Sequence, residues 1–121
     1  MDKALVIDDE IDICILLVRQ LKNLGFQASY CLNVKSANAE LASNSYDLIF
    51  VDLNLTDGSG YELIHFLRTF DKTAKIIVIS AYEGERQKAL EVGVSLYIPK
   101  PFTKKTIREA LHKLNFLNNL T

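Results

Sequence analysis

The chain of 121 residues is 49% hydrophobic and 24% charged, which is the balance of an ordinary globular domain. Its formal net charge of −1 excludes a strong overall attraction to nucleic acid or to an anionic membrane surface. No stretch approaches the roughly 20 consecutive apolar residues of a membrane span, and the first residues lead into a strand rather than a signal peptide. These features predict one domain over residues 1–121, located in the cytoplasm and bound to neither membrane nor nucleic acid.

Five short apolar segments are predicted as strands, and each precedes a segment with the apolar period of a helix. The predicted strands are residues 3–7, 27–31, 47–51, 75–79 and 95–98. The first helix carries one apolar stripe, formed by Ile11, Cys14, Ile15, Val18 and Leu21. The other four helices are expected over about residues 34–42, 61–70 and 83–92 and after residue 103, and residues 54–60 are expected to form a turn-rich loop.

Polar residues and glycines predict where these helices begin and end. Asn33 and Thr103 are expected as N-caps, because their side-chain oxygens accept hydrogen bonds from free helix amides. Gly25 and Gly93 are expected to end the first and fourth helices, because glycine adopts the left-handed conformation without strain. The strict alternation of strand and helix predicts an α/β fold with a parallel sheet and helices on both faces. The commonest strand order for five such units is 2-1-3-4-5, a doubly wound, flavodoxin-like (βα)5 sheet.

Chemically reactive side chains follow four of the five predicted strands. Asp8 and Asp9 follow the first strand, Asp52 the third, Ser80 the fourth and Lys100 the fifth. A carboxylate beside a buried strand is costly unless something compensates its charge, so a purely structural role is disfavoured. Because parallel strands place their carboxyl ends at one edge of the sheet, we expect all five side chains to meet there.

The predicted cluster has the composition of a magnesium-dependent phosphoryl-transfer site. Three neighbouring carboxylates raise one another's pKa values unless a cation neutralises them, and oxygen-only ligands suit Mg²⁺. Lys100 adds a positive charge and Ser80 adds a hydroxyl group. Such groups position and neutralise a phosphoryl group, and an ionised aspartate needs no general base to act as a nucleophile.

The remaining candidates for chemistry are assigned structural roles. His65 and His112 lie within predicted helices, away from the strand ends, and are expected as surface or boundary residues. Cys14 and Cys31 have no CxxC spacing and are expected to be buried free thiols.

Several short motifs together resemble the receiver domain of bacterial response regulators. They are the pair Asp8-Asp9, Asp52 with Gly60 eight residues later, Ser80-Ala81, and Lys100-Pro101-Phe102. Each motif alone is common, but these occur in the family's order and at its spacing. The resemblance extends over essentially the whole chain, from Lys3 to about Leu117.

The resemblance implies a role for each residue of the cluster. Asp52 would be the phosphoacceptor, phosphorylated by a sensor histidine kinase or a histidine phosphotransfer protein. Asp9, Asp52 and the backbone carbonyl of Asn54 would bind Mg²⁺ directly, and Asp8 would act through water. Lys100 would pair with the phosphoryl oxygens. Beyond its own phosphorylation and slow autodephosphorylation, the chain would catalyse nothing.

The resemblance also implies a switch that carries the signal to the surface. Ser80 would hydrogen-bond the phosphate, and Tyr97 would turn inward on activation. These movements would reshape the surface formed by the fourth helix, fifth strand and fifth helix, which is also the expected homodimer contact. The peptide bond between Lys100 and Pro101 is expected to be cis.

Three other functions are weighed against this one. A flavodoxin-like cofactor binder would need a glycine- and hydroxyl-rich phosphate loop after the first strand, where Asp8-Asp9-Glu10 stands instead. A phosphohydrolase with an aspartyl nucleophile would usually carry a D-x-D pattern there and a cap domain. A degenerate receiver that serves only as an interaction module is disfavoured by the presence of all the cluster residues.

Overall fold

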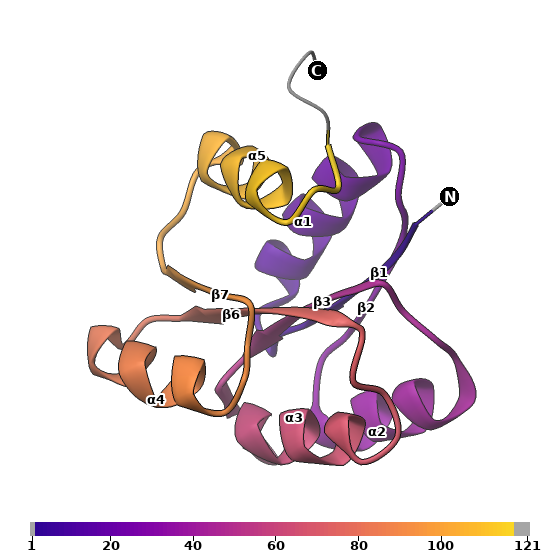
Figure 1. Cartoon of the computed structure of the whole chain (residues 1–121), viewed down its shortest axis with the longest axis vertical. Coiled ribbons are helices and arrows are strands. Elements are labelled where there is room, and N and C mark those ends of the chain that lie inside the picture. Colours follow the sequence, from indigo (N-terminus) through magenta and orange to yellow (C-terminus); the bar gives the residue numbers. More distant parts are fainter. Residues whose placement is uncertain (1, 118–121) are drawn as a thin grey trace.

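A five-stranded parallel sheet forms the centre of the protein, in a computed structural model that describes residues 2–117. The strand order is β2-β1-β3-β6-β7, which confirms the predicted order 2-1-3-4-5 once the five sheet strands are numbered along the chain (Figure 1). The strands are β1 (Lys3–Ile7), β2 (Gln27–Cys31), β3 (Leu48–Asp52), β6 (Lys75–Ser80) and β7 (Leu96–Pro99).

Helices cover both faces of this sheet, as the alternating sequence pattern predicts. Helices α1 (Ile11–Asn23) and α5 (Lys104–Lys113) cover one face, and α2 (Val34–Ser43), α3 (Gly60–Arg68) and α4 (Arg86–Glu91) cover the other (Figure 1). Successive strand residues point to opposite faces, so Val6 packs in the core beneath α1 and α5, while Ile7 packs in the core beneath α2 and α3. Burial on both faces explains why the strands are almost entirely apolar.

The predicted helix caps are present. Asn33 Oδ1 accepts a hydrogen bond of 2.8 Å from the Ser36 amide at the start of α2. Thr103 Oγ1 accepts one of 3.2 Å from the Thr106 amide, and the Thr106 hydroxyl completes a capping box at the start of α5. Gly25 has a φ of 99°, a conformation that favours glycine, just after α1 ends.

Two segments differ from the expected pattern. The loop after β3 contains a short antiparallel hairpin of β4 (Asn54–Leu55) and β5 (Gly58–Ser59), which was expected only as turns. Two-residue strands are too short to leave a periodic signal. The expected helix over residues 83–92 divides into a 3₁₀ turn, η1 (Glu83–Glu85), and α4. Within these two elements only Ala89 is buried, so little apolar packing holds a continuous helix there.

A side chain from the new hairpin fixes the start of α2. Asp57 accepts hydrogen bonds from the amides of Val34 (2.7 Å) and Lys35 (3.1 Å). The bond from Val34 is the largest cause of a lowered pKa at Asp57. The hairpin that follows Asp52 is therefore anchored to the neighbouring helix. Separately, none of the helices within residues 2–117 has the length and apolar character needed to cross a membrane.

Candidate functional site

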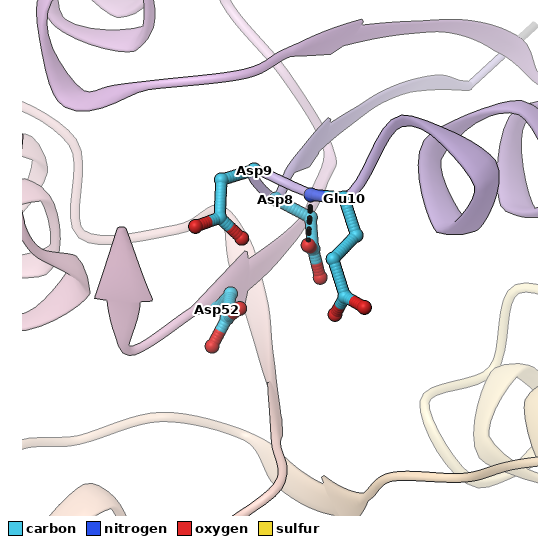
Figure 2. A group of neighbouring side chains, drawn as sticks. All are labelled: Asp8, Asp9, Glu10 and Asp52. Carbon is cyan, nitrogen blue, oxygen red and sulfur yellow. Dashed lines mark hydrogen bonds between the residues drawn. The ribbon is translucent and has the colours of Figure 1, made fainter. Parts of the chain in front are cut away.

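Four carboxylates gather where β1 and β3 end. These strands are paired in parallel with Ile7 opposite Val51, so Asp8 and Asp52 leave the sheet at the same level. One oxygen from each of Asp8, Asp9, Glu10 and Asp52 lies within 4.8 Å of the others. Figure 2 shows these side chains, drawn from the two adjacent strand ends, with the amide of Glu10 bonded to Asp8. The structure therefore brings together the predicted aspartates and adds a glutamate.

Asp52 is held in place through both of its carboxylate oxygens. Oδ1 accepts a hydrogen bond of 3.1 Å from the amide of Asn54, and Oδ2 one of 3.1 Å from Lys100 Nζ. Only 7% of the side chain is exposed. The carboxylate is thus fixed at the rim of the sheet with a cation beside it.

Lys100 lies among three of the carboxylates. Its Nζ is 2.7 Å from Glu10 Oε2, 2.9 Å from Asp8 Oδ2 and 3.1 Å from Asp52 Oδ2. Burial lowers the pKa of this ammonium, but the hydrogen bonds to Glu10, Asp8 and Asp52 outweigh burial and raise the pKa above its ordinary value. The Lys100 amide donates to the Ser80 carbonyl, and the following bond to Pro101 is cis, as predicted.

Asp8 is the most deeply placed acid of the group. Its side chain is completely buried, and Oδ1 accepts a hydrogen bond of 2.8 Å from the Glu10 amide. Burial raises the pKa of this carboxyl, which the Glu10 amide and Lys100 only partly counter. Because several carboxylates lie together here around the ammonium of Lys100, the site favours additional positive charge.

Gly60 lets the chain pass directly over Asp52. A Cβ atom at this position would lie 3.0 Å from the carbonyl carbon of Asp52 and 3.0 Å from Cα of Leu53, and would overlap the Asp52 carbonyl oxygen. The Gly60 amide instead donates a hydrogen bond of 3.0 Å to the Leu53 carbonyl. The spacing of Gly60 from Asp52 therefore has a steric cause.

Ser80 and Tyr97 both form hydrogen bonds with the backbone of one residue, Tyr82, in the β6–η1 loop. The buried Ser80 hydroxyl accepts a hydrogen bond of 3.1 Å from the Tyr82 amide, and the Tyr97 hydroxyl donates to the Tyr82 carbonyl. Tyr97 is buried, with the guanidinium of Arg86 4.9 Å from its ring centroid. In this structure Tyr97 already lies inward, the position that the resemblance implied for it on activation.

The donor set fits a hard divalent cation. Asp8, Asp9 and Asp52 offer only oxygen atoms at close range, which is the chemistry that Mg²⁺ favours. The amide of Asn54 bonds to Asp52, so this residue also borders the cluster. Glu10 was not among the predicted site residues, although it extends the acidic run Asp8-Asp9. Its place beside Lys100 depends on a contact between residues 90 positions apart.

Comparison with known proteins agrees with this geometry. The sequence profile of the response regulator receiver domain matches residues 4–112. The sensory transduction protein LytR of Staphylococcus epidermidis is 34% identical over 116 residues, which cover 93% of this chain and 46% of that protein. The chain therefore spans about half the length of the curated relatives it matches.

Solved structures of receivers superpose closely on this fold. The response regulator TrrA of Thermotoga maritima, solved in complex with Mg²⁺-BeF, is 32% identical with a TM-score of 0.85, covering 94% of this chain and 99% of that one. A response regulator of Burkholderia pseudomallei, solved with a phosphorylated aspartic acid, a calcium ion and citrate, is 27% identical with a TM-score of 0.83, covering 96% and 72%. This chain belongs to the response regulator receiver domain family, the signalling domains of two-component systems.

Proposed function

We propose that Asp52 is the phosphoacceptor of this receiver and that a sensor histidine kinase or a histidine phosphotransfer protein supplies the phosphoryl group. The observation that carries the proposal is the fixed Asp52 carboxylate, 3.1 Å from Lys100 Nζ within a cluster of oxygen ligands. The whole chain, residues 1–121, acts as one receiver unit in the cytoplasm.

The reaction requires little from the protein beyond position and charge. An Asp52 carboxylate oxygen forms a bond to phosphorus while the bond from phosphorus to the imidazole nitrogen breaks, and the electron pair leaves with the imidazole. Lys100 places its ammonium against the transferring oxygens and neutralises part of their charge. Asp9, Asp52 and the Asn54 carbonyl would hold Mg²⁺, with Asp8 acting through water, and the bound ion would supply the remaining charge neutralisation.

The signal leaves the site through the backbone of Tyr82. Its amide holds the Ser80 hydroxyl, and its carbonyl holds the Tyr97 hydroxyl. When Ser80 turns to the phosphoryl oxygens, its hydroxyl releases the Tyr82 amide and the loop moves. The hydrogen bond from the Tyr97 hydroxyl to the Tyr82 carbonyl then breaks or re-forms in the new loop position. The surface of α4, β7 and α5 then changes shape, and this surface forms the homodimer contact.

Incubation with acetyl phosphate and Mg²⁺, followed by intact-mass measurement, tests the phosphoacceptor. The wild-type protein should gain the mass of one phosphoryl group, and the Asp52→Asn variant should gain none. An equal gain in the variant would place the modification on another residue and reject the assignment.

The proposed route to the surface has a separate test. Ser80→Ala and Tyr97→Ala should still be phosphorylated at Asp52, but the amide resonances of α4 and β7 should change less than in the wild type. A response equal to that of the wild type in both variants would show that the signal travels elsewhere.

A further inference from the structure

The ammonium of Lys100 is saturated by carboxylates in the unphosphorylated protein. A lysine ammonium has three N–H donors and no acceptor, and here three carboxylates lie within 3.1 Å of it. The shortest of the three contacts is to Glu10, at 2.7 Å, and the longest is to Asp52. Phosphorylation converts the Asp52 carboxylate itself into an acyl phosphate, so the N–H donor that Asp52 held passes to the phosphoryl group. A second hydrogen bond from Lys100 to a phosphoryl oxygen forms only if Asp8 or Glu10 gives up its place.

Burial decides which of the two other carboxylates, Asp8 or Glu10, yields. The side chain of Asp8 is completely buried and that of Asp52 is 7% exposed, whereas that of Glu10 is 59% exposed. Removing a buried carboxylate from its partner leaves a charge without compensation, which costs several kcal/mol. An exposed carboxylate is rehydrated when it leaves, so its ion pair contributes little to stability.

The backbone of Glu10 is fixed, and only its side chain is free to move. The Glu10 amide donates to Asp8 Oδ1, and its carbonyl accepts from the amides of Ile13 and Cys14 at the start of α1. Glu10 and Lys100 also line a surface hollow of about 470 Å³, whose other lining residues are mostly apolar. The carboxylate therefore lies between the ammonium and solvent, on the open side of the site.

From this geometry we propose that Glu10 is a positioning residue that holds Lys100 in the unphosphorylated receiver and competes with the phosphoryl group for its ammonium. The inference rests on the proposed role of Asp52 as phosphoacceptor. Glu10 accepts the N–H of Lys100 that faces solvent until a phosphoryl oxygen replaces it. Its carboxylate also adds negative charge on the side from which an anionic phosphodonor approaches. Glu10 thus slows phosphorylation and keeps Lys100 ordered while Asp52 is unmodified.

The test compares Glu10→Gln with Asp12→Asn. Both variants remove one negative charge at the start of α1, but Asp12 is exposed and makes no contact with Lys100. In metal-free protein, acetylation of Lys100 by acetic anhydride should be about two- to fivefold faster in Glu10→Gln than in the wild type, the range expected for one exposed ion pair. Lys104 and Lys105 serve as internal references on the same chain, and Asp12→Asn should match the wild type.

A kinetic measurement completes the test. At saturating Mg²⁺, Glu10→Gln should be phosphorylated by acetyl phosphate about two- to fivefold faster than the wild type, and Asp12→Asn should stay closer to the wild-type rate. Unchanged Lys100 acetylation, or a phosphorylation rate equal to or below that of the wild type, overturns the role of Glu10. If the wild type itself gains no phosphoryl group, the proposal that Asp52 is the phosphoacceptor fails. The acetylation of Lys100 is measured without phosphorylation, so it tests the contact between Glu10 and Lys100 separately.

Discussion

Replacing Gly60 by alanine tests whether the close passage of α3 over Asp52 shapes the site. The new methyl carbon would lie 3.0 Å from two backbone carbons, whereas carbon atoms prefer about 3.5–4.0 Å, and it would overlap the Asp52 carbonyl oxygen. Because the neighbours are backbone atoms rather than flexible side chains, the strand end or the helix must shift. Overpacking of this kind costs about 1–3 kcal/mol.

The glycine-to-alanine change also has a favourable part, which must be subtracted. Restricting the unfolded chain contributes about 0.4–1 kcal/mol of stability wherever the native backbone tolerates alanine. The net loss at Gly60 is therefore at most about 2.6 kcal/mol, with a midpoint of about 1.3 kcal/mol, which lowers the melting temperature of a chain of this length by about 5 °C. Phosphorylation by acetyl phosphate should also slow, since the carbonyl that moves belongs to Asp52.

Gly84→Ala is the matched control for this substitution. No atom lies within 4 Å of a Cβ built at Gly84, and its φ is not in the left-handed region. The Gly84→Ala protein should melt at the wild-type temperature or a few degrees above it, because alanine restricts the unfolded chain without a clash in the folded one. Thermal unfolding followed by circular dichroism compares the three proteins. A Gly60→Ala protein as stable as Gly84→Ala would refute the steric reasoning.

Three further predictions concern caps and thiols. Thr103→Ala should lose about 1 kcal/mol, measured by urea unfolding, because it removes the capping box of α5; an unchanged midpoint would contradict that role. The amides of α2 lower the pKa of Asp57 from 3.8. The contribution of this ionised carboxylate to the free energy of unfolding is therefore complete above pH 3.8, and it disappears as the pH falls through the folded-state pKa. The stability advantage of the wild type over Asp57→Asn should therefore be constant near neutral pH and shrink below pH 3.8, and an advantage that persists in acid would reject this linkage. Burial raises the pKa of Cys14 to about 12, so its thiol should react with a disulfide reagent at pH 8 only after unfolding, and rapid reaction of the native protein would show that the site opens.

Much of this receiver could be predicted from the sequence because its signals are local. Apolar runs such as residues 76–79 mark strands that are buried on both faces, and Asn33 and Thr103 mark helix starts through hydrogen bonds to nearby amides. Parallel pairing then places every strand end at one edge of the sheet. The meeting of Asp8, Asp52 and Lys100 follows from that topology, without knowledge of any side-chain position.

Only the tertiary structure decided which groups occupy the space around these residues. Whether Glu10 reaches Lys100, whether Asp57 caps α2 and whether Tyr97 points inward depend on contacts between segments far apart in the chain. Such contacts leave no periodic signal, since each involves one side chain and is set by how the elements pack. The sequence by itself therefore determined the sheet, its order and the acids at its edge, while packing decided how the single ammonium is shared among them.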